Sequence, residues 1–379
     1  MKFAHLSDLH LGKKVDEYSM IEDQAYILQQ ILQILDEERP DGVIIAGDVY
    51  DKSVPSAEAV TLFDAFLVDL AKRKLHVFVI SGNHDSPERI AFGARLMQAG
   101  NVFLSPVYNG TVTPVTLEDA YGKIKVWMLP FVKPVHVRKA FPEEEIASYT
   151  DAVRVAVDHM PVDTGERNIM ITHQFVTGAE RSDSEETSIG GTDNVDASVF
   201  DVFDYTALGH IHRPQNCGSA RVRYSGTPLK YSFSEVNDQK SVTFVELFEK
   251  GKIEVKTVDL KPKRDLVEIR GRYEEITLRD FYKDTTYPDD YLRITLTDEE
   301  DIPDAIGKLR SIYHNIMKLD YDNRRTRENN SIDAADVTVQ KSPYEYFAEL
   351  YEKQNNAPMN EAQQKWITEM IEKIWEENV

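Results

Sequence analysis

Five short clusters of Asp, Asn and His each follow the C-terminal end of a predicted strand. In open α/β architectures, that edge of the sheet is where binding and catalytic sites are built. We therefore expect the five clusters to meet in one site. They are Asp8-Leu9-His10, Gly47-Asp48, Gly82-Asn83-His84-Asp85, Thr172-His173 and Gly209-His210-Ile211-His212.

The side-chain types in these clusters are those of a metal centre. Carboxylate, amide and imidazole ligands without a thiolate suit Mn, Fe or Zn, and Mn is commonly bound by mixed sets of oxygen and nitrogen ligands. A two-metal centre needs about seven protein ligands, one of them a bridging carboxylate, to hold cations roughly 3.5–4 Å apart. Glycines 47, 82 and 209 would let the backbone turn sharply after each strand. The clusters supply seven ligands: Asp8, His10, Asp48, Asn83, His173, His210 and His212.

Each cluster taken alone has an ordinary interpretation. An Asp-x-His pair is usually a surface pair, Gly-Asp is usually turn chemistry, and a lone Thr-His at a strand end is usually a structural histidine. Gly-Asn-His-Asp and Gly-His-x-His are much rarer, and all five together in this order favour a site. The other histidines lie in no such cluster and are interpreted as structural or surface residues: His5, His76, His136, His159 and His314.

The elements that must position these clusters begin with strand and helix alternation, which is typical of α/β layers. Apolar periodicity predicts strands at 2–6, 42–46 and 76–80, and helices at 20–35, 56–70 and 86–98. From about residue 101 the chain is rich in strands, with one helix near 143–157 and a long polar loop over 177–196. The candidate strands there are 101–104, 124–129, 169–172, 205–208, 222–225, 241–246 and 253–258.

The region after Leu260 predicts further units. Lys-Pro-Lys-Arg-Asp is a linker, and a smaller α/β unit follows with strands at 266–269 and 291–296 and a helix at 302–312. Residues 320–336 are polar and charged. Ser342, Pro343 and Glu345 begin a helix in the manner of a capping box, and Asn360 can cap a second one. Each of these two helices carries an apolar stripe that includes aromatic side chains.

Composition excludes several classes of protein. The 379 residues hold 44 basic and 65 acidic side chains, a net charge of −21, which disfavours nucleic-acid binding by bulk positive charge. Phosphates would need a local attraction, and bound cations would provide one. The single cysteine excludes an intrachain disulfide framework. Because there is no apolar stretch of about 18–20 residues and no signal-peptide core, we expect a cytoplasmic protein. No Gly-x-x-x-x-Gly-Lys-Ser/Thr loop occurs, so ATP use would come from a partner.

The five clusters resemble those of the calcineurin-like metallophosphoesterases, and most closely those of the SbcD-type nuclease subunits of bacterial SbcCD complexes. Three further stretches carry the closer resemblance. They are the opening Met-Lys-Phe-Ala-His-Leu-Ser-Asp-Leu-His-Leu-Gly, Asp48-Val-Tyr-Asp-Lys-Ser-Val-Pro-Ser56, and Tyr224-Ser-Gly-Thr-Pro-Leu-Lys-Tyr-Ser-Phe-Ser-Glu235. The motifs span Asp8 to His212.

This resemblance implies an architecture. The expected fold is α/β, a two-sheet metallophosphoesterase sandwich flanked by helices, with a small α/β capping domain and a C-terminal helix–loop–helix. The corresponding domains are a nuclease domain at 1–262, a capping domain at 263–336 and an SbcC-binding helical segment at 342–379. A homodimer is expected through the helices at 56–70 and 86–98, whose apolar residues lie on more than one face.

The resemblance also implies a chemistry. Two Mn ions (Mg, Fe or Zn being possible) would be held by Asp8, His10, Asp48 and His212, and by Asp48, Asn83, His173 and His210, with Asp48 bridging. His84 would be catalytic and not a ligand. The implied activity is a Mn-dependent 3′→5′ exonuclease on duplex DNA and an endonuclease on single strands and hairpins. It would act with an SbcC-type ATPase in DNA repair, recombination and replication.

Two alternatives remain at this point. A phosphoesterase acting on a smaller phosphodiester would use the same metal core. The chain beyond Leu260 favours the nuclease, because a minimal phosphatase needs no second α/β unit. A non-catalytic scaffold that has lost its metals should lack ligands, whereas the motifs here are complete. Local basic residues near the motif loops could hold DNA: Lys13, Lys14, Lys52, Arg89, Lys133, Arg138, Arg213 and Lys230. Each of them could equally be a solvated surface charge.

Overall fold

The computed structural model describes residues 1–185, 193–300, 302–323, 343–355, 358–360, 363–368 and 370. Contacts divide the chain into two units. The first comprises Met1–Arg270, Glu274–Ile294 and Asp304–Leu319, and the second comprises Gly271–Tyr273, Thr295–Pro303 and Asp320–Val379.

The first unit is built around two six-stranded sheets. The first sheet has the order β14-β13-β1-β4-β5-β6, in which β1, β4, β5 and β6 are parallel and β13 is antiparallel to β1. Its strands are β1 (Lys2–Leu6), β4 (Gly42–Ala46), β5 (His76–Ile80), β6 (Val102–Leu104), β13 (Ser241–Leu247) and β14 (Ile253–Asp259).

The second sheet has the order β11-β12-β10-β9-β8-β7, and its four central strands are parallel. Its strands are β7 (Val115–Asp119), β8 (Gly122–Leu129), β9 (Arg167–His173), β10 (Tyr205–Gly209), β11 (Gln215–Cys217) and β12 (Ser219–Tyr224). The seven strands predicted from residue 101 onward are all present, whereas β7 and β11 carry too few alternating apolar residues to be predicted.

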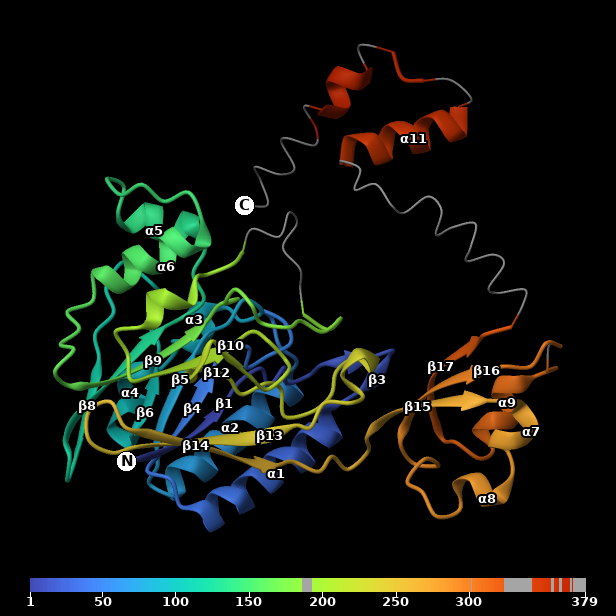
Figure 1. The fold of residues 1–379 in the computed structure, drawn as a ribbon, viewed down its shortest axis with the longest axis horizontal. Coiled ribbons are helices and arrows are strands. Elements are labelled where there is room, and N and C mark those ends of the chain that lie inside the picture. Colours follow the sequence, from blue (N-terminus) through green and yellow to red (C-terminus); the bar gives the residue numbers. More distant parts are fainter. Residues whose placement is uncertain are drawn as a thin grey trace. The chain divides into compact units, whose positions relative to one another are not determined.

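Three apolar clusters hold the sandwich together. One lies between the sheets and includes Phe3, Ile44, Phe78, Ile169 and Tyr205. A second joins the outer face of the first sheet to α1 (Ile21–Glu38) and α2 (Ala57–Lys72). The third joins the outer face of the second sheet to α5 (Pro134–Ala140) and α6 (Tyr149–Asp158) (Figure 1). The predicted two-sheet sandwich flanked by helices is thus the fold of this unit.

One predicted helix is broken. The sequence pattern predicts a single helix at 86–98, but the structure has α3 (Pro87–Ile90), α4 (Ala94–Met97) and the short 3-10 turn η1 (Gln98–Gly100). Gly93 lies between them at φ +73°, in the left-handed region that ends helices. Ser86 caps the first turn of α3, and Pro87 occupies its first position. Phe92 and Leu96 are consequently 82% and 84% exposed.

Smaller elements complete the chain. β2 (Lys14–Val15) and β3 (Tyr18–Ser19) pair with each other, and η2 (Ala197–Phe200) and η3 (Phe233–Glu235) are 3-10 turns. A three-stranded sheet has the order β15-β16-β17, with β15 (Leu266–Gly271), β16 (Tyr291–Leu296) and β17 (Asn315–Tyr321). Its helices are α7 (Tyr273–Ile276), α8 (Arg279–Tyr282) and α9 (Ala305–Arg310). The sequence pattern does not predict β17.

The C-terminal part contains α11 (Pro343–Asn355) and a second helical stretch at 363–368. Asn360 caps that stretch, because its Oδ1 accepts from the N–H of Gln363 while Gln363 Oε1 accepts from the N–H of Asn360, both at 2.9 Å. This agrees with the predicted cap. Ser342 and residues 371–379, which complete the predicted capping box and second stripe, lie outside the described residues.

Candidate metal centre

The site lies where strands of both sheets end. Asp8 follows β1, Asp48 follows β4 through Gly47, and Asn83 follows β5 through Ser81 and Gly82. In the second sheet His173 is the last residue of β9, and His210 follows β10 directly. The main-chain N–H of His210 donates to Asp8 Oδ1 at 3.0 Å, which ties the two sheet edges together.

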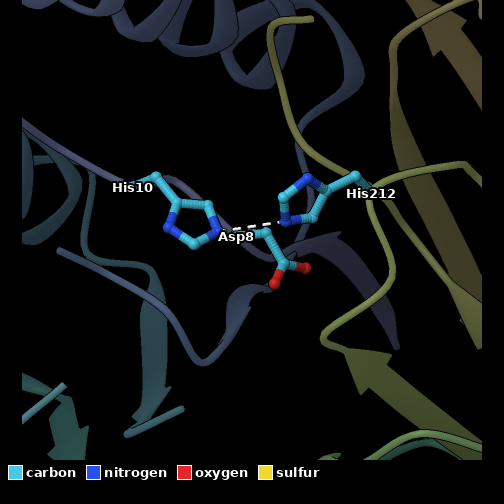
Figure 2. A group of neighbouring side chains, drawn as sticks. All are labelled: Asp8, His10 and His212. Carbon is cyan, nitrogen blue, oxygen red and sulfur yellow. Dashed lines mark hydrogen bonds between the residues drawn. The ribbon is translucent and has the colours of Figure 1, made fainter. Parts of the chain in front are cut away.

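One group of side chains consists of Asp8, His10 and His212; the two imidazoles face each other and Asp8 lies beside them (Figure 2). Their ligand atoms lie within 4.8 Å of one another, and the Nε2 atoms of His10 and His212 are 3.1 Å apart. All three residues are buried. Two imidazole nitrogens and a carboxylate at this separation could serve as ligands to one cation.

A second group lies beside the first. His173 Nε2 and His210 Nδ1 both lie 3.0 Å from Asn83 Oδ1, and His173 Nε2 lies 3.3 Å from Asp48 Oδ2. The same Asp48 oxygen is 3.7 Å from His10 Nε2 in the first group. The other oxygen, Asp48 Oδ1, accepts a hydrogen bond from the main-chain N–H of His84 at 2.9 Å. One oxygen of Asp48 therefore faces both groups.

His84 lies at the edge of the site and is 16% exposed. Its Nδ1–H donates to the carbonyl oxygen of Asp51 at 3.0 Å, so its Nε2 atom faces inward, 3.9 Å from Asp48 Oδ2. His84, His10 and Asp48 also form a group with ligand atoms within 4.8 Å. The geometry thus permits either a proton-donating or a ligating role for His84.

Burial and mutual charge set the titration of these groups. Burial raises the pKa of Asp8 to about 6, and burial lowers the pKa values of His10 and His210 well below the usual range. Burial alone would also lower the pKa of His173, but the carboxylates of Asp48 and Asp8 outweigh it and raise the pKa to about 9. The positive charge of His173 thus compensates the buried carboxylates of Asp8 and Asp48. Bound cations would supply that positive charge instead.

Backbone strain is concentrated at the same positions. Asp8, His10, Asp48 and His210 have φ values of 52°, 43°, 46° and 103°. Non-glycine residues seldom adopt this left-handed region, and such strain gathers at functional sites. The strands therefore end in tight turns that aim these side chains inward.

Gly47 and Gly209 are required for two different reasons, backbone conformation and close packing. Gly47 has φ +86°, so it does supply a sharp turn as predicted. For Gly209 that prediction is wrong, because its φ is ordinary and what it supplies is space. A Cβ atom at Gly209 would lie 1.9 Å from the carbonyl oxygen of Ala46 and 2.6 Å from His173 Nδ1. The two sheets approach each other at this glycine.

Comparison with known proteins gives the context for this geometry. The family model described as calcineurin-like phosphoesterase matches residues 1–214, which contain every predicted site residue. A protein of Staphylococcus epidermidis, named as the SbcD component of the nuclease SbcCD, is 34% identical over 323 residues, covering 84% of this chain and 85% of that protein. The chain belongs to the calcineurin-like phosphoesterase family, and within it to the SbcD nucleases.

A second relative, a second family model and a crystal structure also match parts of the chain. A second SbcD relative, from Staphylococcus saprophyticus, is 32% identical over 346 residues and covers 90% of this chain and 89% of that protein. The family model described as type 5 capsule protein repressor C-terminal domain matches residues 262–355. The crystal structure of a dimetal phosphatase from Danio rerio is similar at 12% identity and a TM-score of 0.45, over 69% of this chain and 98% of that one.

Membership of this family makes the chain a metal-dependent phosphodiesterase, and the residues present fit divalent cations. The donors facing the centre are carboxylate, amide and imidazole, and they are buried at 0–8% exposure for Asp8, His10, Asp48, His173, His210 and His212. His10 Nδ1 is buried without a hydrogen-bond partner among the described residues. Such a concentration of ionisable groups is costly to bury unless it is compensated.

The sequence pattern assigns no role to two residues that support the site, Tyr231 and Asp85. Tyr231 packs edge-on against His10, and its hydroxyl donates to the Leu9 carbonyl at 2.7 Å. Asp85 accepts from the N–H groups of Val49 and Tyr50, which shapes the turn after Asp48. Only the family resemblance points to the 224–235 stretch, and no spacing rule connects it to the metal-ligand candidates.

The basic residues near the site have varied environments. Lys13 pairs with Asp51 at 2.8 Å, and Arg213 pairs with Glu180 and Asp238 at 2.6 and 2.8 Å. Lys230 lies 3.0 Å from Asp265. A polar hollow of about 440 Å³ beside Tyr231 is lined by four basic side chains together with Asp16 and Asp183. The basic side chains are those of Lys13, Lys14, Arg293 and Lys318.

No helix among the described residues is long and apolar enough to cross a membrane.

Proposed function

We propose that this chain is a Mn-dependent DNA nuclease, a 3′→5′ exonuclease on duplex DNA and an endonuclease on single strands and hairpins. It would act with an SbcC-type ATPase in processing DNA breaks and hairpins. The observation that carries the proposal is the position of Asp48 Oδ2, 3.3 Å from His173 Nε2 and 3.7 Å from His10 Nε2. An oxygen shared by two ligand groups is what a two-cation centre requires, because neighbouring dications repel strongly.

The proposed ligand sets follow from this arrangement. Asp8, His10, Asp48 and His212 would hold one cation, and Asp48, Asn83, His173 and His210 would hold the other. Bound cations would supply an activated water and charge stabilisation for an in-line attack on phosphorus. Mn is the metal of choice for this mixture of oxygen and nitrogen donors, with Mg, Fe or Zn as alternatives.

His84 has a separate role in this proposal. Its Nδ1–H donates to the Asp51 carbonyl, so Nε2 is the nitrogen that faces the site. From the rim of the site, His84 in its imidazolium form would donate the Nε2 proton, or a hydrogen bond from it, to the phosphate or to the leaving 3′ oxygen. The cations lining the 440 Å³ hollow beside Tyr231 would attract the strand's phosphates despite the negative net charge of the chain.

The proposal extends to the organisation of the chain. A nuclease domain at 1–262 would be followed by a capping domain at 263–336 that shapes DNA access and by an SbcC-binding segment at 342–379. The relatives are named as components of SbcCD, which supports an SbcC-type partner. The exposure of Tyr346, Leu350 and Trp366 at 58%, 54% and 61% supports docking through the C-terminal helices.

The test compares substrates and metals with the full-length chain. Purified protein, stripped with EDTA and reloaded with Mn, is assayed on end-labelled duplex DNA, on a DNA hairpin and on bis-para-nitrophenyl phosphate. Shortening of the duplex from its 3′ end and opening of the hairpin, both lost in EDTA, support the nuclease. Hydrolysis of the small diester with neither DNA activity would instead favour a phosphoesterase on smaller substrates. Loss of all three activities with no bound metal would indicate a non-catalytic scaffold.

A further inference from the structure

Polar contacts hold both the main chain and the imidazole of His212. Its main-chain N–H donates to Glu185 Oε1 at 2.7 Å, and its carbonyl oxygen accepts from Lys240 Nζ at 2.8 Å. Its imidazole Nδ1 lies 2.5 Å from the hydroxyl of Ser184. His173 and His84, by comparison, each use Nδ1–H to reach a main-chain carbonyl oxygen, that of Ala46 and that of Asp51.

The Ser184 hydroxyl continues to a buried ion pair. Ser184 Oγ lies 2.5 Å from Glu235 Oε1, and Glu235 Oε2 lies 2.6 Å from Lys240 Nζ. Glu235 is fully buried and Lys240 is 4% exposed. The close ion pair with the Lys240 ammonium group keeps Glu235 an ionised carboxylate.

These contacts determine the tautomer of His212. An ionised carboxylate only accepts hydrogen bonds, so Ser184 must donate its single proton to Glu235. Ser184 Oγ can then only accept from His212, which places a proton on Nδ1. The lone pair of Nε2 is consequently directed at the site, where Nε2 lies 3.1 Å from His10 Nε2 (Figure 2).

We propose that Ser184, Glu235 and Lys240 form a positioning relay that orients the His212 imidazole and fixes its tautomer for metal binding. Lys240 contacts both ends of the relay, the Glu235 carboxylate and the His212 carbonyl, so that the main chain and the imidazole of His212 are held by one ion pair. The relay assigns a role to Glu235, the last residue of the 224–235 stretch. This inference rests on the proposed metal centre, because the relay acts on one of its ligands.

The relay predicts a selective effect on metal binding. Outer partners of metal-ligating histidines typically contribute 10–100-fold in affinity. Ser184→Ala breaks the connection between Glu235 and His212 without removing the buried ion pair. We expect it to weaken Mn binding by about 10-fold or more at the site containing His212, and to leave the site of Asn83, His173 and His210 unchanged. Ser184→Thr keeps the hydroxyl and should restore the affinity.

The measurement is isothermal titration of EDTA-stripped full-length protein with Mn, fitted to two sites. Ser105→Ala is the matched control, because Ser105 is a buried serine whose hydroxyl has no hydrogen-bond partner among the described residues. The same variants are unfolded by urea without metal, since a merely structural cluster would change stability and not Mn affinity. Equal Mn affinities in wild type and Ser184→Ala would overturn the relay, whereas a wild type that binds no Mn would overturn the metal centre itself.

A second measurement reads the tautomer directly. With ¹⁵N-labelled histidine in the metal-free protein, we expect His212 to carry its proton on Nδ1, the signals being assigned by their loss in His212→Gln. Glu235→Gln gives position 235 an amide that can donate, so Ser184 is no longer forced to accept from His212. Both Ser184→Ala and Glu235→Gln should therefore show a mixture of tautomers. A pure Nδ1–H form in both variants would contradict the proposed relay.

Discussion

The Nδ1–H of His173 donates to the carbonyl oxygen of Ala46 at 2.9 Å, although 127 residues separate the two. His173 ends a strand of one sheet and Ala46 ends a strand of the other. The contact fixes the His173 ring so that Nε2 faces Asp48 and Asn83. The packing of the two sheets thus sets the orientation of a metal-ligand candidate, and variants that separate the sheets at this point should impair the site.

Asp48→Asn tests the shared carboxylate. The variant keeps the shape of the side chain but removes the charge that offsets two neighbouring cations, so we expect Mn-dependent cleavage to fall by at least about 10³-fold, the equivalent of about 4 kcal/mol. Metal analysis should show fewer than two Mn per chain. The control is Asp204→Asn, a buried carboxylate that pairs with Lys250. Wild-type cleavage by Asp48→Asn would end the assignment of Asp48 as the bridge.

His84→Ala separates catalysis from metal binding. Because His84 Nε2 reaches the site from its rim, we expect Mn stoichiometry and DNA affinity to be retained while turnover falls by about 10²–10⁴-fold, the usual contribution of a positioned proton donor. Mn content, DNA binding by fluorescence anisotropy and single-turnover cleavage provide the comparison. Loss of one Mn in this variant would instead place His84 among the ligands, with His10 and Asp48.

Gly209→Ala tests the close approach of the sheets. The added methyl group would lie 1.9 Å from the Ala46 carbonyl oxygen, so the strands must move apart, and overpacking of this kind costs about 1–3 kcal/mol or more. We expect a lower free energy of unfolding in urea and weaker Mn binding, since the His173–Ala46 hydrogen bond is displaced. Gly100→Ala is the control, because its added Cβ would meet no described atom within 4 Å. Equal effects of the two substitutions would contradict this account.

Sequence periodicity predicts most of the sandwich because its elements are locally determined. Strands such as β4 and β5 are continuous apolar segments, and α2 lies within the helix predicted at 56–70 apart from its last two residues. The break at Gly93 is not predicted because apolar residues continue at helical spacing on both sides of it. The strand β17 is not predicted because few of its residues are buried, so its apolar alternation is weak.

For the site, the sequence predicts the ligand candidates at the strand ends but not the residues that support them. The residues at strand ends can be found because parallel strands bring their carboxyl ends to one edge. Ser184, Glu235 and Lys240 cannot be found in this way, since their relation to His212 depends on how a loop and a 3-10 turn pack in three dimensions. The need for glycine at 209 is likewise a property of the distance between two sheets and not of local turn geometry.

Phe92→Glu tests the proposed homodimer. Phe92 and Leu96 are 82% and 84% exposed on the broken helical segment, and large exposed apolar side chains usually mark interfaces. A buried charge at Phe92 should shift full-length protein from dimer to monomer in light scattering, with bis-para-nitrophenyl phosphate hydrolysis largely retained. Leu278→Glu, at a position 62% exposed elsewhere in the chain, is the control and should leave the dimer intact. A wild type that is monomeric at every concentration would remove the basis for this prediction.

His5 provides a pH-dependent contact between the two sheets. It is fully buried in β1, and its imidazole lies 2.9 Å from the hydroxyl of Tyr205 and 3.1 Å from the carbonyl oxygen of Leu208, both in β10. Burial, together with the nearby charge of Arg223, lowers the pKa of His5 to about 3. The folded chain therefore keeps His5 neutral at a pH where an unfolded chain protonates it.

The sign of the resulting pH effect follows from proton uptake. Between the unfolded pKa of about 6.5 and the folded pKa of about 3, the unfolded state binds one more proton at His5, so the contribution of His5 to stability is present above pH 6.5 and is lost as the pH falls. The loss approaches about 1.4 kcal/mol per pH unit below 6.5. His5→Gln cannot titrate, so its free energy of unfolding should fall less steeply between pH 7 and pH 5 than that of the wild type. Urea unfolding of both proteins in EDTA at pH 7, 6 and 5 measures the difference, and parallel curves would show that His5 titrates alike in the folded and unfolded chain.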